Sequence, residues 1–286
     1  MSVVTRFAPS PTGDLHLGHA YAAWFAHDLA TRSGGRFLVR IEDIDVGRCR
    51  DEFVARNLDD LRWLGLTWEQ PVVRQSERMD RYGDALCRLS ALDVVYPCFC
   101  TRGEIRAEIE AAAAAPHAAA ADGGPVYPGR CRGLAANERA DRLAAGRPYA
   151  LRLDAERARR LTGALSWTDG GRGPQSVRPD RFGDVVVARK EIATSYHLAV
   201  VVDDAAQGVT HVTRGEDLFE ATHVQRTLYA LLDLPVPVWH HHGLCRDRHG
   251  RRLAKRDGAA SIRSLRERGH PPEQVLAMAK AAGGGP

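Results

Sequence analysis

Strand-like and helix-like hydrophobic patterns alternate at the start of the chain. Residues 3–7 form a short apolar-rich run that predicts a strand, and a breaker-rich segment at 8–13 (Ala-Pro-Ser-Pro-Thr-Gly) ends it. Apolar residues then recur at helical spacing over 17–29, until Ser-Gly-Gly at 33–35 ends the predicted helix, and 36–41 predicts a second strand. A strand, loop, helix and strand in this order form a βαβ unit, which implies a parallel sheet.

The rest of the pattern adds further helices and strands. Near-continuous apolar runs at 185–187 and 198–202 are typical of strands buried on both faces of a parallel sheet. Ser76 is placed to serve as the N-cap of the helix that follows it. Helical stripes are predicted at 54–64, 79–89 and 218–232. The fold class is therefore predicted to be α/β.

Residues 98–150 interrupt this alternation and predict an insertion. They contain cysteines and an Ala-rich tract at 111–121, and because alanine side chains bury too little surface to form a core, we expect a helical or mobile insertion. The chain then divides into the first half of a sheet domain at 1–97, the insertion at 98–150, the second half at 151–240, and a basic loop with a short helical tail at 241–286.

Composition narrows the class of protein. The 286 residues are 44% hydrophobic and 27% charged, which is ordinary for a globular chain with a real core. No apolar run is long enough for a transmembrane helix, and the first residues lack the apolar core of a signal peptide, so a cytoplasmic protein with no membrane partner is expected. The net charge of +4 is compatible with an RNA partner. Of the 40 basic residues only Lys190, Lys255 and Lys280 are lysines, so each is a candidate functional residue.

The loop between the first predicted strand and helix is a candidate nucleotide site. Doubly wound sheets bind nucleotides at such loops, because free backbone N–H groups and the helix dipole favour phosphate. His16 and His19 lie at the start of the helix, and Gly18 between them would allow a ligand ring to approach the backbone. The alternative is that both histidines merely cap the helix or face water. The basic run at 251–256 could close over a polyphosphate or be an ordinary solvated patch.

Several long motifs occur in order along most of the chain. They are Arg-Phe-Ala-Pro-Ser-Pro-Thr-Gly at 6–13, His-Leu-Gly-His at 16–19, Arg-Ile-Glu-Asp-Ile-Asp at 40–45, Ser-Tyr-His-Leu-Ala-Val-Val-Val-Asp-Asp at 195–204, and Gly-Val-Thr-His-Val-Thr-Arg-Gly-Glu-Asp-Leu at 208–218. Together they resemble the glutamyl branch of the class I aminoacyl-tRNA synthetases. The resemblance implies a Rossmann-like parallel-sheet catalytic domain that binds ATP with Mg²⁺ and activates L-glutamate as glutamyl-adenylate without tRNA.

The resemblance also assigns residues to the reaction. The residues implied to be catalytic are His16, His19 and Lys255, and those implied to bind ATP are the same three with Gly18. The residues implied to bind L-glutamate are Arg6, Phe7, Ala8, Pro9, Ser10, Glu42, Tyr196 and Arg214. Among them the arginines and the tyrosine would hold the substrate carboxylates, since a guanidinium fork binds carboxylates bidentately, and the glutamate would hold the α-amino group.

These assignments have alternatives. Both arginines and Tyr196 could be ordinary surface and core residues, and Glu42 could be a partner of Arg40. The loop at 252–255 reads Arg-Leu-Ala-Lys, whereas the family usually has Lys-Leu-Ser-Lys or Lys-Met-Ser-Lys. Because the serine hydroxyl is lost, reduced activity and a catalytically silent RNA-binding paralogue are both hypotheses.

Only residues 257–286 follow the lysine loop. Full-length members of the family carry a large helical anticodon-binding region there, so the chain is expected to resemble shorter members, which transfer glutamate to the queuosine base in the anticodon of tRNA(Asp). Queuosine-modified tRNA(Asp) is then the implied partner of a monomeric enzyme, bound through arginines and an unstacked base. A protein or small-molecule acceptor for glutamate is the alternative.

Cysteine spacing adds a candidate metal site. Cys98, Cys100, Tyr127 and Cys131 match the zinc ligands of those shorter members, which implies one structural Zn²⁺ held by three thiolates and a phenolate oxygen. Reduced cysteines in a packed insertion are the alternative. The three histidines at 240–242 are not expected to bind a metal, because consecutive strand residues point to opposite faces. The cysteines expected to be free or buried thiols are Cys49, Cys87 and Cys245.

Overall fold

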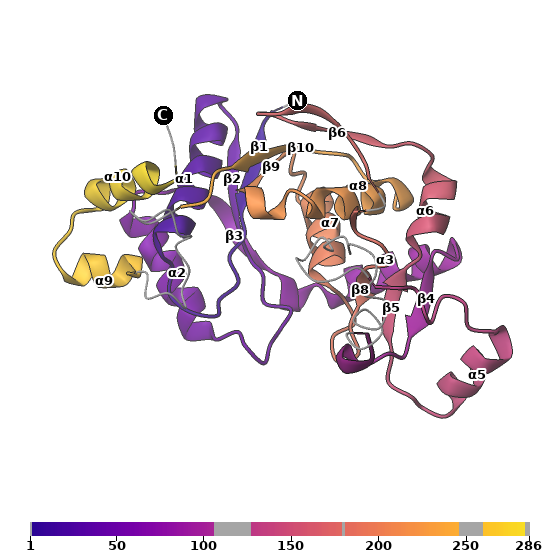
Figure 1. Ribbon diagram of the computed structural model, residues 1–286. Coiled ribbons are helices and arrows are strands. Elements are labelled where there is room, and N and C mark those ends of the chain that lie inside the picture. The colour runs from indigo at the N-terminus through magenta and orange to yellow at the C-terminus, as the bar shows by residue number, and fades with distance from the viewer. Residues whose placement is uncertain (1, 106–126, 179–180, 246–259, 284–286) are drawn as a thin grey trace, which may run out of the picture.

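Parallel strands form the centre of the molecule in the computed structural model, which describes residues 2–105, 127–178, 181–245 and 260–283 (Figure 1). One sheet has the order β1-β2-β3 and consists of β1 (Val4–Phe7), β2 (Arg36–Ile41) and β3 (Glu69–Arg74). A second has the order β7-β6-β10-β9 and consists of β6 (Ser166–Asp169), β7 (Gly173–Ser176), β9 (His211–Gly215) and β10 (Val238–His242). The backbone N–H of Thr210 donates to the carbonyl oxygen of Val4 at 3.0 Å, so the two sheets meet where β9 lies beside β1 (Figure 1).

Helices cover these strands in two groups, each with its own hydrophobic core. The helices are α1 (Leu17–Arg32), α2 (Asp51–Trp63), α3 (Met79–Ala91), α6 (Ala155–Thr162), α7 (Tyr196–Ala206), α8 (Ala221–Leu231), α9 (Ile262–Glu267) and α10 (Pro272–Ala282). One core joins β1 and β2 to α1, α2, α9 and α10, and the other joins β9 and β10 to α3, α6, α7 and α8. None of the helices in the described residues has both the length and the apolar character that a membrane span requires.

The predicted βαβ unit is confirmed by β1, α1 and β2. The two strands pair in parallel, with Val4 opposite Arg36. The helix ends at Arg32, where Gly34 adopts a φ of +59°, a left-handed conformation that glycine reaches without strain. The helices predicted at 54–64, 79–89 and 218–232 correspond to α2, α3 and α8.

The strand predicted at 198–202 is wrong, because these residues belong to α7. The Ser195 side chain accepts a hydrogen bond from the backbone N–H of Leu198, which caps the helix. Because α7 is packed against α3, α8 and β8 (Val186–Ala188), nearly every side is buried, and its valines give the same unbroken apolar run as a buried strand. The run at 185–187 does contribute to a strand, β8, but its pairing is antiparallel.

Asp203 on α7 anchors this helix to α3 and to the segment before it. Its fully buried carboxylate accepts hydrogen bonds from Tyr82 Oη at 2.7 Å, Gln75 Nε2 at 3.0 Å and Arg78 Nε at 2.6 Å. A carboxylate with three donors of this kind satisfies the requirement that a buried charge be paired and hydrogen-bonded.

The predicted N-cap role of Ser76 is also wrong. Ser76 lies in a 3-10 turn, η1 (Gln75–Glu77), and α3 begins only after Arg78, which makes no side-chain cap. The Ser76 backbone N–H and Oγ both donate to the Asp43 carboxylate at 2.8 Å. The local capping signal was therefore outweighed by a tertiary partner that follows β2.

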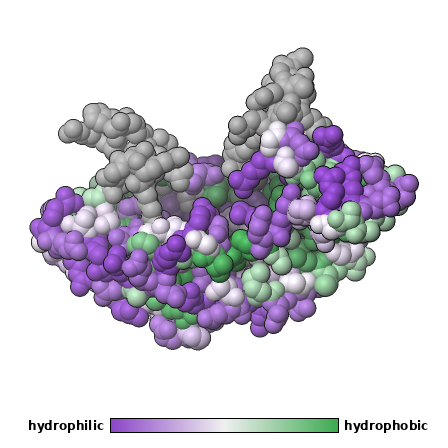
Figure 2. Space-filling model, turned by 90° about the horizontal axis from the view of Figure 1, so that it is seen from below, coloured by the Kyte–Doolittle hydropathy of each residue, from purple (hydrophilic) through white to green (hydrophobic). Residues whose placement is uncertain are grey.

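The insertion rests on a small antiparallel sheet with the order β4-β5-β8. Its other strands are β4 (Val95–Cys98) and β5 (Ala150–Leu153), and the helix α5 (Ala136–Ala144) also lies in the described part of 98–150. The Ala-rich tract at 111–121 lies outside the described residues. Seen from below, hydrophobic side chains gather near the middle of the molecule, between hydrophilic surroundings (Figure 2).

Candidate active site

Two arginines from separate segments meet where β1 and β9 run side by side. Arg6 lies on β1 and Arg214 on β9, and Nη1 of Arg6 donates to the carbonyl oxygen of Thr213 at 3.1 Å. The residues are only 5% and 6% exposed, so the alternative that they are surface arginines is wrong. A pair of buried guanidinium groups is unusual and requires anionic or polar partners.

Arg6 has such an anionic partner in the protein itself. Its Nε and Nη2 atoms donate to the two carboxylate oxygens of Asp204 at 3.0 and 3.2 Å. Burial alone would lower the pKa of Arg6, but the Asp204 carboxylate raises it above its ordinary value. Asp204 also accepts from Arg40 at 2.8 Å, and although burial would raise its pKa, Arg6 and Arg40 hold it below the usual range.

Arg214 is held differently, because its partners are neutral. Its guanidinium donates to Gln225 Oε1 at 2.7 Å, to Thr222 Oγ1, and to His241 Nε2 at 3.1 Å. Within the described parts of the chain, no carboxylate lies within ion-pair distance of it, and burial lowers its pKa. Since a buried cation without a counter-charge is costly, the arrangement favours a bound anion at this arginine.

Tyr196 lies near both arginines, and Glu42 lies near Arg6. Tyr196 is half-buried at the start of α7, and its hydroxyl is close enough to Arg6 and Arg214 to raise the pKa of each. Glu42 follows β2, and its backbone N–H donates to the carbonyl oxygen of Pro9 at 3.0 Å, which ties the two loops together. Burial raises the pKa of the Glu42 carboxyl, although the nearby Arg40 and Arg6 oppose this.

The alternative partner for Glu42 is present in the structure. Nη2 of Arg40 donates to Glu42 Oε1 at 3.3 Å. This contact orients the carboxylate near Arg6, so an ion pair with Arg40 and a position beside Arg6 occur together. The carboxylate is therefore placed where a cationic group of a ligand would find an anionic partner.

The other residues expected to bind glutamate lie at the end of β1 and in the loop after it. The Phe7 ring is buried in the core under α1, so Phe7 faces the site only through its backbone. Ala8 is half-buried, Pro9 is buried and Ser10 is exposed. Of these, only Ser10 offers a side-chain hydrogen-bonding group.

His16 and His19 form the N-terminal cap of α1. The Nδ1 atom of His16 accepts from the backbone N–H of Gly18 at 3.0 Å, and that of His19 accepts from the backbone N–H of His16 at 3.2 Å. In a neutral ring whose Nδ1 accepts, the proton lies on Nε2, and both rings lie at a helix start, where anions are favoured. Both histidines therefore do cap the helix, as the alternative stated. Capping through Nδ1 is compatible with phosphate binding at the same helix start.

Gly18 is also required by its neighbour in the chain, His16. A Cβ atom there would lie 2.9 Å from Cε1 of His16, so the glycine makes room for the His16 ring. The ring in turn lies against that of His19, with centroids 3.9 Å apart. Lys255 and the rest of the basic run at 251–256 lie outside the described residues.

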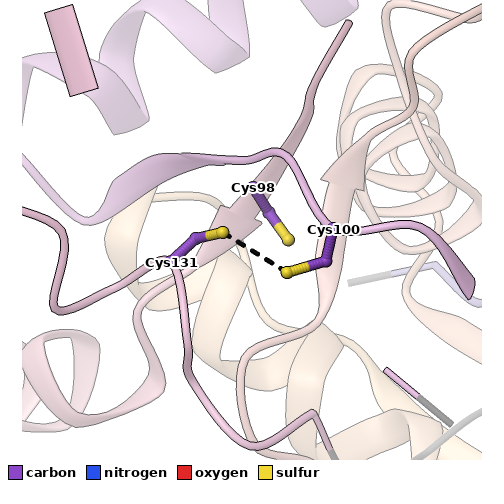
Figure 3. A group of neighbouring side chains, drawn as sticks. All are labelled: Cys98, Cys100 and Cys131. Atoms are coloured by element: carbon purple, nitrogen blue, oxygen red, sulfur yellow. Dashed lines mark hydrogen bonds between the residues drawn. The ribbon is translucent and has the colours of Figure 1, made fainter. Parts of the chain in front are cut away.

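Three cysteines of the insertion converge with a tyrosine. The sulfurs of Cys98, Cys100 and Cys131 all lie within 4.8 Å of one another (Figure 3). The closest two, Cys100 and Cys131, are 3.4 Å apart, and the Tyr127 hydroxyl is 3.5 Å from the sulfurs of Cys98 and Cys100. The structure therefore brings these four side chains together, and all six cysteines are free thiols.

Sequence reasoning missed the residues that hold the arginines. Asp204 was inside a recognised motif and His241 inside the histidine triplet, yet neither was assigned a contact. The triplet does diverge: His240 stacks on His211, the His242 ring contacts Tyr21, and only His241 reaches Arg214.

Comparison with known proteins defines the class. Residues 2–285 match the family model described as tRNA synthetases class I (E and Q), catalytic domain. The chain belongs to this family and is an enzyme of the ligase type. A glutamate tRNA ligase from Elizabethkingia meningosepticum, solved in complex with its amino acid, superposes with a TM-score of 0.81 at 29% identity, over 98% of this chain and 60% of that one.

Within the family, the chain is similar to proteins named Glutamyl-Q tRNA(Asp) synthetase. The one from Rhodobacter capsulatus is 53% identical over 96% of this chain and 98% of the relative, and the one from Nocardia farcinica is 47% identical over 96% and 82%. A Glutamate--tRNA ligase from Aquifex aeolicus is 38% identical over 96% of this chain and 56% of its own length.

Proposed function

We propose that the enzyme uses ATP to activate L-glutamate as glutamyl-adenylate without tRNA, and then transfers glutamate to queuosine in the anticodon of tRNA(Asp). The proposal that glutamate is the amino acid activated rests on Arg214, a buried cation with neutral partners next to a second buried arginine. Such a pocket favours a dicarboxylic amino acid over its amide, because the amide leaves the charge unbalanced.

The chemistry follows from the arrangement of the loops. The α-carboxylate of glutamate attacks the α-phosphorus of ATP, a new carbon–oxygen–phosphorus bridge forms, and the bond to pyrophosphate breaks. Arg6, Arg214 and Tyr196 would hold the carboxylates and Glu42 the α-amino group. The Nε2 donors of His16 and His19 would stabilise charge on the phosphates, together with Lys255 and the Mg²⁺ that accompanies ATP.

Sequence identity to the relatives supports the proposed transfer of glutamate to queuosine in tRNA(Asp). It is 53% and 47% with two proteins named for glutamyl-Q tRNA(Asp) and 38% with a glutamate--tRNA ligase. In the transfer step, a hydroxyl of queuosine would attack the carbonyl carbon of the adenylate, forming an ester and releasing AMP. The nucleophile differs from that of ordinary tRNA charging, but the activated acyl group is the same.

The cysteine cluster is proposed to hold one structural Zn²⁺. A tetrahedral zinc with metal–sulfur bonds of about 2.3 Å places its sulfurs roughly 3.8 Å apart, which is close to the spacing found here. Burial would raise the pKa of Cys131, but hydrogen bonds, first that from the Phe99 backbone, hold it below its ordinary value. Burial raises the pKa of Cys100 to about 12, so that thiol would lose its proton on binding the metal. The Tyr127 oxygen completes a donor set of four.

The proposed function is tested by ATP–pyrophosphate exchange with glutamate and no RNA, followed by transfer of labelled glutamate to tRNA(Asp) with and without queuosine. Exchange and queuosine-dependent labelling are expected. Labelling of tRNA(Glu), or equal labelling of both forms of tRNA(Asp), would overturn the acceptor. Label on protein alone would favour a protein acceptor. Absence of exchange would favour a catalytically silent paralogue, a hypothesis suggested by Ala254 in place of the usual serine.

A further inference from the structure

Three side chains from neighbouring strands form a continuous chain of contacts that ends at Arg214. Asp169 ends β6, His241 lies on β10 and Arg214 on β9, where His241 and Arg214 are paired in register. Asp169 Oδ2 and His241 Nδ1 are 2.6 Å apart with both side chains fully buried, and His241 Nε2 is 3.1 Å from Arg214 Nε.

The directions of these hydrogen bonds are fixed by the donors. An arginine Nε–H can only donate, so Nε2 of His241 accepts and the ring proton lies on Nδ1, where it is donated to Asp169. The other Asp169 oxygen, Oδ1, accepts from the backbone N–H groups of Gly171 and Arg172, each at 2.9 Å. The carboxylate therefore cannot turn without breaking three hydrogen bonds.

We propose that Asp169 and His241 are positioning residues for amino-acid recognition: Asp169 holds His241 in the tautomer that accepts from Arg214, so that Arg214 is oriented while its charge stays unbalanced. The inference rests on the proposed function, since it concerns the residue that would bind the substrate carboxylate. Burial, and then the charge of Arg214, lower the pKa of His241 to about 4, so the ring is neutral near pH 7.

A neutral acceptor at this place has a consequence for specificity. A carboxylate at 241 would orient Arg214 equally well, but it would also neutralise it, as Asp204 does for Arg6. The pocket would then no longer favour a second carboxylate on the substrate. The histidine orients the guanidinium without removing the charge that discriminates glutamate from glutamine.

The first variant for the test is Asp169→Asn, which is nearly isosteric. The two backbone donors keep the amide oxygen at the Oδ1 place, so the amide nitrogen must face His241 Nδ1. The ring then accepts at Nδ1 and carries its proton on Nε2, which opposes the Arg214 N–H. We expect the KM for glutamate in ATP–pyrophosphate exchange to rise about 10- to 100-fold, with the KM for ATP within about 2-fold.

The second variant separates this role from a purely structural one. His241→Gln places an amide oxygen within reach of Arg214 and needs no tautomer, so we expect a KM for glutamate within about 5-fold of wild type. Adding Asp169→Asn to His241→Gln should change it by less than about 2-fold, because Asp169 acts only through the ring. His241→Glu should raise it more than about 100-fold and abolish discrimination against glutamine.

His240→Gln is the matched control, because this neighbour on β10 stacks on His211 and does not touch Arg214. Its kinetics should equal those of wild type. Equal losses from Asp169→Asn with and without His241→Gln, or unchanged discrimination in His241→Glu, would overturn the inference. If the Asp169→Asn chain does not fold, the inference is tested by comparing His241→Glu with His241→Gln in their KM for glutamate and their discrimination against glutamine. A wild-type chain that shows no glutamate-dependent exchange would instead overturn the proposed function.

Discussion

Arg6 donates to the main-chain carbonyl of Thr213, and this bond sets its guanidinium beside that of Arg214 on the next strand. The two cations are neighbours but are not equivalent. Arg6 forms a bidentate ion pair with Asp204, whereas Arg214 has only neutral partners among the described residues. Charge selection in the pocket is therefore expected to depend on Arg214 more than on Arg6.

Replacing Arg214 should show this directly. We expect Arg214→Gln to lower kcat/KM for glutamate in ATP–pyrophosphate exchange by about 100-fold or more, because a charge-assisted carboxylate pair is worth several kcal/mol when buried. Binding of ATP alone, measured by calorimetry, should be unchanged. A variant that keeps full exchange activity would contradict the assignment of Arg214 to the substrate.

Removing the charge of Asp204 should affect stability. Asp204→Asn leaves Arg6 and Arg40 without their shared carboxylate, so the free energy of unfolding should fall by about 3 kcal/mol or more. The measurement is urea unfolding followed by circular dichroism. Arg36→Gln is the control, since it breaks an exposed ion pair with Glu69 that is expected to contribute little to stability.

The same carboxylate should contribute to acid unfolding. The pKa of Asp204 is lowered in the folded state, so its stabilisation is complete above the unfolded value of about 3.9 and is lost as the pH falls through the folded value. Unfolding of the wild type should therefore become easier below about pH 4. In Asp204→Asn that dependence should be smaller, and an equal slope in both proteins would argue against the ion pair.

Glu42 should make glutamate binding depend on pH. Because its pKa is raised, chiefly by burial, the carboxyl becomes protonated at a higher pH than an ordinary glutamate would. The KM for glutamate should thus rise as the pH is lowered through that range, since the charged form would bind the α-amino group. Glu42→Gln should show a high KM that does not change over the same range, and a parallel profile in both proteins would refute this role.

Metal content should follow the cysteine cluster. Elemental analysis should find about one zinc per chain in the wild type and in Cys87→Ser, which alters an exposed thiol, but much less in Cys131→Ser. A chelator should lower the Tm of the wild type more than that of Cys131→Ser. Equal zinc in all three proteins would show that the cluster is not the site.

The sequence predicted the N-terminal βαβ unit because its signals are local: an apolar run, breakers, helical spacing and a glycine stop. It could not separate a helix from a strand at 198–202, since α7 is buried nearly all round and its valines follow neither period. The neutral partners of Arg214 could not be predicted from the sequence for another reason. Thr222, Gln225 and His241 come from α8 and β10 and share no pattern until those elements fold against β9.

Two consecutive carboxylates near the end of α7 both lie near Arg40 but accept hydrogen bonds from different residues. Asp204 accepts from Arg6 and Arg40, while Asp203 accepts from Tyr82, Gln75 and Arg78. One turn of helix thus anchors both the amino-acid pocket and the segment that leads into α3. Selection for heat-resistant variants is therefore expected to leave Asp203 and Asp204 unchanged. A replacement of either one that destabilises the fold would also disturb the selection of the substrate.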